Sequence, residues 1–386
     1  MFSKKTLYNQ DFELLLIEKN EQLNFFCELI NSNDVLAIDT EFTRRNTYYP
    51  ILSTIQIALK KTNKFKLLAL IDVIKCPNIS QILKIINNPQ ITKIFHCSLQ
   101  DLQIFHKISQ LVPINIYDTQ IMANFCQEKP NIGYSSLVKN LFSIEICKKM
   151  QNSDWQSRPL NQSQIDYAMV DVLFLHEIYE NFLKILNSRH QFDWFIEEMS
   201  NFIDKISSEN SPNLIKSFQI SKLDLPTINN LNKLIFLREK FAKIYNLPRE
   251  HLLKNNDLLN IAKIDKKIFN SNNLPQNLPI EFSQIIADEI NKDDILSPIK
   301  LPTGLDIIDK KNIDKIKSLV AKISKKFQFN EQFLLNNNQI KNIVINKNVK
   351  NSINDWRYKI LGDQIEQIIY NQHENNHRKL ENESRL

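Results

Sequence analysis

The sequence predicts an α/β domain in its first half, in which helices flank a mixed sheet, followed by two small all-α domains. Short apolar segments at 35–38, 51–59, 66–73 and 91–95 have the length and composition of buried strands. After about residue 212 the apolar residues recur at helical spacing, without the alternation that marks strands. A chain of 386 residues is long enough for two or three such domains.

The first strand places two acidic side chains together. Asp39 and Glu41 directly follow the apolar run 35–38, and residues two apart on a strand point to the same side. We therefore expect both carboxylates to project from the carboxyl end of this strand. The next two strands follow closely, which suggests hairpins and an antiparallel early part of the sheet.

Two helices are predicted to bring further polar groups to the same place. The stretch from Ser98 onward has a helical apolar pattern, so Asp101 lies in a first helical turn, where the helix dipole favours an anion. A later helix is marked by Asn161 with Gln164 three residues on, a pattern typical of a capping box. Its buried stripe is Ile165, Ala168, Met169, Val172, Leu175 and Tyr179.

Tyr167 and Asp171 are four residues apart on that last helix, so they are neighbours on one of its faces. Each fragment alone is commonly a solvated turn or an ordinary helix surface. Together, and in this order, they predict one site. Carboxylates that converge in this way repel one another unless divalent cations lie between them, so the pattern indicates a metal site. Its four carboxylates are Asp39, Glu41, Asp101 and Asp171.

The sequence around these residues resembles ribonuclease D, a family of DEDD-type 3′–5′ exonucleases with a ribonuclease H-like fold. The resemblance is close over about residues 14 to 185. It rests on Ala37-Ile38-Asp39-Thr40-Glu41-Phe42, Thr47-Tyr48-Tyr49-Pro50, Ile55-Gln56-Ile57-Ala58, Phe95-His96, Gln100-Asp101-Leu102, Tyr117-Asp118-Thr119-Gln120, Ser153-Asp154-Trp155, Arg158-Pro159-Leu160 and Tyr167-Ala168.

The resemblance implies a chemistry and a substrate. The residues that match the four carboxylates bind two magnesium or manganese ions, and the residue that matches Tyr167 positions the attacking water, which marks the tyrosine subgroup. The implied reaction is two-metal-ion hydrolysis of RNA from its 3′ end, which releases nucleoside 5′-monophosphates. The implied partners are RNAs, especially tRNA precursors with 3′ extensions, and the implied state is a monomer. The family often has an acidic residue where this chain has Val170, and an arginine where it has Asn152.

Four further residues are candidate substrate contacts: Phe42, Arg44, Gln56 and His96. Surface solvation is an even alternative for Arg44, and a structural role is an alternative for His96. Trp155 and Arg158 are expected to brace the approach to the last helix.

The predicted domains are an exonuclease domain at 1–206, a helical domain at 212–296, a second at 300–372 and a disordered tail at 373–386. Leu237-Arg238-Glu239-Lys240-Phe241-Ala242 and Asp257-Leu258-Leu259-Asn260-Ile261-Ala262 resemble an HRDC domain, and Asp355-Trp356-Arg357 resembles the close of a diverged second one. Generic helical core is an alternative for the second. Candidate phosphate contacts, or residues of a solvated charged face, are Lys222, Lys233, Arg238, Lys240, Lys243 and Arg249.

The composition fits a nucleic-acid enzyme without establishing one. The net charge is +6, and 42% of the residues are hydrophobic. No apolar run has the length of a membrane span or a signal peptide, and the five scattered cysteines indicate reduced thiols, so we expect a cytoplasmic protein.

Two alternatives remain open at this point. One is a DNA exonuclease of the same fold, because a metal site binds phosphates whichever sugar they carry. The other is a non-catalytic RNA-binding protein, which all five intact site positions disfavour.

Overall fold

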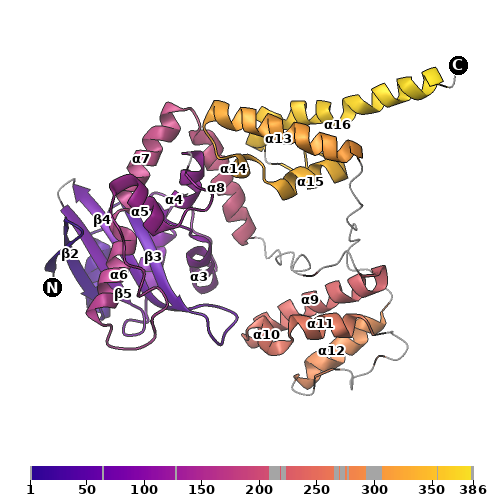
Figure 1. The fold of residues 1–386 in the computed structure, drawn as a ribbon. Helices are drawn as coiled ribbons and strands as arrows, with labels where there is room; N and C mark the ends of the chain where they lie inside the picture. The colour runs from indigo at the N-terminus through magenta and orange to yellow at the C-terminus, as the bar shows by residue number, and fades with distance from the viewer. Residues whose placement is uncertain are drawn as a thin grey trace. The chain divides into compact units, whose positions relative to one another are not determined.

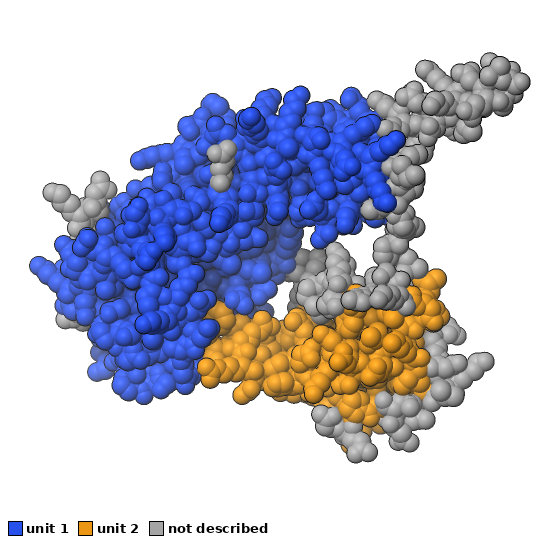
Figure 2. All heavy atoms as spheres, viewed as in Figure 1, with its two compact units in different colours: residues 1–41, 53–207, 304–386 blue, residues 42–52, 208–303 orange. Residues whose placement is uncertain are grey.

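The computed structural model describes most of the chain. The described residues are 2–62, 65–126, 128–207, 218, 223–264, 269, 274–275, 278–292, 307–353 and 355–383. They form two compact units, coloured separately in Figure 2. Unit 1 comprises 1–41, 53–207 and 304–386, and unit 2 comprises 42–52 and 208–303.

Unit 1 is built on a seven-stranded sheet with the order β1-β2-β5-β4-β3-β6-β7 (Figure 1). Strands β4 and β5 pair antiparallel, whereas β2–β5, β3–β6 and β6–β7 pair parallel, so the predicted mixed sheet is confirmed. The strands are β1 (Ser3–Leu7), β2 (Gln10–Ile17), β3 (Val35–Thr43), β4 (Ile51–Thr62), β5 (Phe65–Asp72), β6 (Thr92–Phe95) and β7 (Ile116–Asp118).

Strand β3 is longer than its apolar run. It continues to Thr43, so Asp39 and Glu41 lie within the strand, whereas the sequence predicted them at its carboxyl end. The residues that extend it, Thr40 and the pair Phe42 and Thr43, have high β propensity and sustain the extended backbone. The two carboxylates therefore project from regular sheet, which fixes their relative direction.

Helices cover the sheet, with α6 packed on β5 and α7 on β6. The sequence predicted one continuous helix as far as Tyr179. This prediction is wrong, because the helix is interrupted at Phe174, between α6 and α7. The helices of this part are α1 (Asn20–Glu28), α2 (Ser80–Ile86), α3 (Leu99–Ser109), α4 (Thr119–Phe125), α5 (Tyr134–Phe142), α6 (Gln162–Leu173), α7 (Leu175–Ser188) and α8 (Phe192–Ser207).

The last four helices belong to the same compact unit as the sheet. They are α13 (Ile307–Phe327), α14 (Glu331–Leu334), α15 (Asn337–Asn346) and α16 (Asp355–Glu383). Trp356 of α16 stacks on Trp194 of α8 with ring centroids 5.7 Å apart, and its indole N–H donates to Glu198 at 3.0 Å. Arg357 completes the contact with a 2.5 Å ion pair to the same carboxylate. The segment predicted as a separate domain is thus held against α8.

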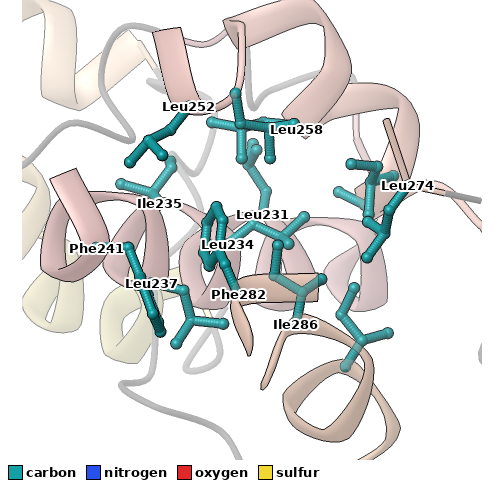
Figure 3. Packing of buried hydrophobic residues seen from close by; sticks show 14 of the residues in the cluster. Leu231, Leu234, Ile235, Leu237, Phe241, Leu252, Leu258, Leu274, Phe282 and Ile286 are labelled. Carbon is teal, nitrogen blue, oxygen red and sulfur yellow. The ribbon is translucent and has the colours of Figure 1, made fainter. Parts of the chain in front are cut away.

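The described helices of unit 2 are α9 (Leu225–Tyr245), α10 (Arg249–Leu252), α11 (Asn255–Ala262) and α12 (Ile280–Asn291). Its core is the cluster shown in Figure 3, in which the rings of Phe241 and Phe282 pack with their centroids 4.5 Å apart. Tyr48, which lies between β3 and β4 in the sequence, is a member of this core. Its hydroxyl donates to the buried Glu239, so residues 42–52 fold with the helices that follow much later in the chain.

Three of the candidate phosphate contacts have structural roles. Lys233 is fully buried and donates to the carbonyl oxygens of Glu289 and Lys292. Arg238 is buried against the Leu253 carbonyl, and Arg249 pairs with Glu239. Lys233 and Arg238 are thus buried against carbonyl oxygens, whereas the Arg249 side chain pairs with a buried carboxylate and is still 30% exposed. Lys240 is exposed and Lys243 is half-buried, and Lys222 lies outside the described residues.

Helix α16 continues to Glu383 through most of the tail that the sequence predicts to be disordered. None of the described helices is both long enough and apolar enough to span a membrane. The five cysteines are all free.

The contact between α8 and α16 supports a stability prediction. Trp356→Ala removes a fully buried indole and should lower the free energy of unfolding by about 3–5 kcal/mol, because a large cavity replaces it. Denaturant unfolding followed by circular dichroism measures this. Tyr370→Ala, on an exposed part of the same helix, is the control and should cost well under half as much. Equal losses for the two variants would show that this contact does not hold the helix.

Candidate metal centre

Three acidic side chains from two elements form the centre of the site. Asp39 and Glu41 project from β3, and Asp171 from α6. One carboxylate oxygen of each lies within 4.8 Å of the others, and all three residues are half-buried. This is the convergence that the order of motifs predicts.

Asp101 lies beside this group but not in it. It is in the first turn of α3, as predicted, and its Oδ1 accepts a hydrogen bond from the Thr40 hydroxyl of β3. Its charge nevertheless reaches the other acids, because it contributes to the raised pKa values of both Asp39 and Glu41. The structure therefore places all four predicted carboxylates in one electrostatic cluster.

Tyr167 lies one helical turn before Asp171, and its hydroxyl forms a hydrogen bond with that carboxylate. The predicted capping box at the start of α6 is confirmed. Asn161 Oδ1 accepts from the Gln164 backbone N–H at 2.9 Å, and Gln164 Oε1 accepts from the Asn161 N–H at 3.1 Å. This cap fixes the start of the helix that carries both site residues.

The carboxylates are electrostatically unfavourable as bare anions. Burial, and then repulsion from Asp101, Asp171 and Glu41, raises the pKa of Asp39 well above its usual value. Burial, then the charges of Asp171 and Asp101, raises the pKa of Glu41 to about 9. Burial also raises the pKa values of Asp101 and Asp171 to about 7, and hydrogen bonds from Thr40 and Tyr167 oppose this. At neutral pH the cluster favours a bound cation or a bound proton.

The donor set fits divalent metal ions. Carboxylate oxygens are the ligands that Mg²⁺ and Mn²⁺ prefer in proteins, and three of them lie close enough to share an ion. Burial, then the charges of Asp171, Glu41 and Asp39, raises the pKa of Tyr167, so its hydroxyl keeps its proton at neutral pH. A protonated phenol can donate a hydrogen bond here but cannot act as the base.

The segment that leads into α6 is braced as predicted. Arg158 forms a 2.6 Å ion pair with Asp72 of β5, and its guanidinium also donates to the carbonyl oxygens of Ser53 and Trp155. Trp155 is buried beside the Tyr167 ring, with centroids 6.1 Å apart.

The four candidate substrate contacts have different surroundings. Gln56 is fully buried in β4, where its amide donates to Thr54 Oγ1 at 2.6 Å. Both ring nitrogens of His96 face protein groups, Thr119 Oγ1 at 2.9 Å and the Ile132 carbonyl at 3.0 Å, which favours the structural alternative. Phe42 and Arg44 belong to unit 2, where the exposed Arg44 guanidinium lies 5.6 Å from the Tyr48 ring centre.

One residue of the site was missed by the sequence analysis. The buried Tyr134 hydroxyl of α5 donates to the Val170 carbonyl at 2.8 Å and accepts from the Phe174 N–H at 3.2 Å. The hydroxyl thereby bridges backbone groups on either side of Asp171, across the interruption between α6 and α7. No spacing rule connects Tyr134 to a helix that begins 28 residues later, so only the folded structure could reveal it.

Comparison with known proteins agrees with this geometry. A protein-family model described as "3′-5′ exonuclease" matches residues 15–187. Ribonuclease D of Bartonella henselae is 27% identical over 369 residues, which cover 92% of this chain and 89% of the relative. Ribonuclease D of Sphingobium indicum is 33% identical over 251 residues.

The chain is thus similar to ribonuclease D proteins, and residues 15–187 match a domain of the 3′–5′ exonuclease type. The match with the S. indicum ribonuclease D spans 64% of this chain and 63% of that relative, so it covers less than two thirds of the relative's length.

The fold agrees with that of a solved ribonuclease D over nearly the whole chain. The crystal structure of Escherichia coli RNase D, described as an exoribonuclease involved in structured RNA processing, superposes with a TM-score of 0.74. The match covers 92% of this chain and 98% of that one at 23% identity. The helical second half is thus part of the shared architecture.

The position of Tyr134 leads to a prediction. Tyr134→Phe keeps the ring but removes the hydroxyl that closes the helix break, so the Asp171 carboxylate should lose its alignment. We expect kcat on a single-stranded RNA to fall about 10- to 100-fold with KM nearly unchanged, as for other residues that orient metal ligands. The matched control is Tyr179→Phe, whose hydroxyl contacts Tyr117 away from the carboxylates. If both variants retained wild-type kcat, Tyr134 would have no positioning role.

Proposed function

We propose that the protein trims RNA from its 3′ end by two-metal-ion hydrolysis and releases nucleoside 5′-monophosphates. The observation that supports this most strongly is the set of three carboxylates within 4.8 Å, with Asp101 beside them. The ribonuclease D relatives add the substrate class, since their name describes enzymes that act on RNA.

Each residue has a role in this proposal. Asp39, Glu41, Asp101 and Asp171 would hold two divalent ions, Mg²⁺ or Mn²⁺. Such ions supply a water of lowered pKa and neutralise charge at the scissile phosphate. Tyr167 would orient the attacking water through its hydroxyl, because it remains protonated at neutral pH and is a hydrogen-bond donor.

We propose tRNA precursors with 3′ extensions as the natural substrates, and a monomeric enzyme. A DNA exonuclease remains the alternative within this fold, because carboxylates that bind metal ions do not distinguish ribose from deoxyribose. Contacts to the 2′-hydroxyl would decide between them. Initial rates on matched RNA and DNA oligonucleotides therefore test the preference, and we expect RNA to be the faster substrate.

We also propose that residues 212–296 form an HRDC domain that contacts RNA. Support comes from its described helices, α9 to α12, and from the exposed Lys240 on α9. Lys233 and Arg238 are buried, so we no longer propose these two side chains as contacts to the RNA backbone.

The site assignment makes a direct prediction about activity. In a time course on a 3′-extended tRNA with Mg²⁺, Asp39→Asn and Asp171→Asn should each reduce kcat by about 10³-fold or more, since each removes a metal ligand. The chelator EDTA should abolish wild-type turnover. The control is Asp166→Asn, which lies five residues before Asp171 on α6 and outside the carboxylate cluster, and it should retain activity. Near-normal turnover in either ligand variant would refute the assignment.

The raised pKa values predict how pH acts on the metal-free protein. In the folded protein the pKa values of Asp101 and Asp171 are about 7, against a usual 3.8, so the folded state binds more protons than the unfolded state between these values. The free energy of unfolding from this site therefore falls as pH rises from about 4 to 7. Divalent ions bind the ionised form, so their affinity rises over the same range.

Thermal unfolding measures both effects. The increase in Tm on adding Mn²⁺ should be larger at pH 8 than at pH 5, and Asp171→Asn should reduce that difference. An Mn²⁺ effect that is the same at both pH values would contradict the electrostatic description of the cluster.

A further inference from the structure

Thr40 lies in β3 between two acidic residues of the metal centre, but its side chain is on the other face of the strand. Side chains alternate between the two faces of a sheet, so Asp39 and Glu41 share one face and Thr40 has the opposite one. The Thr40 side chain is buried, and a buried hydroxyl needs a hydrogen-bond partner. That partner is the Asp101 carboxylate, which comes from a different element.

The end of strand β6 explains why Asp101 reaches Thr40. Strand β6 pairs parallel with β3, with Ile94 opposite Ala37, and it ends at Phe95. Strand β3 therefore extends beyond β6, at the level where the chain turns into α3 and its first turn carries Asp101. The Asp101 carboxylate takes the place of a strand at this edge. It forms hydrogen bonds with the backbone N–H of Thr40 as well as with the hydroxyl.

The bond between the Thr40 hydroxyl and Asp101 is buried at both ends. The two residues are only 5% and 6% exposed. A hydrogen bond to an ionised carboxylate is stronger than one between neutral groups, and a low local dielectric strengthens it further. The bond therefore fixes the position of one particular oxygen of Asp101, which is Oδ1.

The engaged Oδ1 limits what Asp101 can offer to a metal ion. A carboxylate can bind an ion through one oxygen or through both. Oδ1 is held by Thr40, and Asp101 is not among the three acids whose oxygens lie within 4.8 Å of one another. The second oxygen, Oδ2, is therefore the one that is left for coordination.

We propose that Thr40 is a positioning residue of the metal centre. Its hydroxyl holds Oδ1 of Asp101, so that Asp101 coordinates a divalent ion through Oδ2 alone. The inference rests on the proposed two-metal function and adds to it the way in which one ligand binds. Hydrogen bonds of this kind orient a ligand before the ion arrives, and their loss lowers the affinity for the metal. Thr40 acts through Asp101 and contacts neither the RNA nor the reacting atoms.

Manganese binding by the RNA-free protein tests this role. Isothermal titration calorimetry measures the Mn²⁺ affinity of the wild type, Thr40→Val and Thr40→Ser. Valine keeps the shape and the backbone N–H but lacks the hydroxyl, whereas serine keeps the hydroxyl. The matched control is Thr92→Val, the same change in β6 at a position opposite Val35, where the hydroxyl accepts from Asn115 at 3.2 Å. Circular dichroism verifies that each variant is folded.

We expect Thr40→Val to weaken Mn²⁺ binding about 10- to 100-fold, as for other residues that orient metal ligands. Thr40→Ser and Thr92→Val should stay close to the wild type. On a single-stranded RNA, Thr40→Val should need a correspondingly higher Mg²⁺ concentration for its half-maximal rate, with an unchanged KM for the RNA. A purely structural role would lower the free energy of unfolding and leave both metal dependences unchanged.

The outcomes separate this inference from the proposed function. Wild-type Mn²⁺ affinity in a folded Thr40→Val protein overturns the positioning role and leaves the proposed function intact. If the wild type itself binds no Mn²⁺, the proposed function fails and the role of Thr40 fails with it.

A crystal of the wild type with Mn²⁺ tests the coordination without any substitution, so the proposal can be decided even if Thr40→Val does not fold. We expect the ion at one oxygen of Asp101, with the other oxygen still bonded to the Thr40 hydroxyl. Coordination through both oxygens, or an Oδ1 that has left Thr40 for the ion, overturns the proposal.

Discussion

Repulsion among four acidic side chains is the constraint on which the rest of the structure depends. Asp39, Glu41 and Asp171 hold oxygens within 4.8 Å of one another, and Asp101 adds its charge from α3. Folding alone gives no reason to gather these groups, because burial and mutual repulsion both disfavour their ionised forms. A bound divalent cation makes the ionised carboxylates favourable, because the negative charges that repel one another all attract the cation. The cluster therefore fits the proposed metal site and does not by itself stabilise the fold.

The fold serves this cluster by placing its members on rigid elements. Two acids project from the middle of β3, which has neighbours on both sides in the sheet. Asp171 and Tyr167 share α6, whose start is capped by Asn161 and whose end is closed by Tyr134. The C-terminal helices are held on α8 through Trp356. The carboxylate cluster and the C-terminal helices α13 to α16 are in this way parts of one compact unit.

Much of this was predictable from local patterns. Strand alternation, a capping box and helical spacing located Asp39, Glu41, Asp101, Tyr167 and Asp171 on the right kinds of element, because these signals act over a few residues. The rest depends on contacts between distant parts of the chain. At the helix break the Phe174 N–H donates to the Tyr134 hydroxyl, and Lys233 donates to a carbonyl oxygen more than 50 residues away. The packing of Tyr48 on Glu239 crosses 191 residues. No spacing rule reaches that far.

The most direct test of the central claim is a crystal of the protein soaked in Mn²⁺ and measured by anomalous scattering. The account predicts manganese bound by Asp39, Glu41 and Asp171, with Asp101 drawn in as a further ligand. Carboxylates that stay apart, with no anomalous signal between them at saturating Mn²⁺, would contradict it.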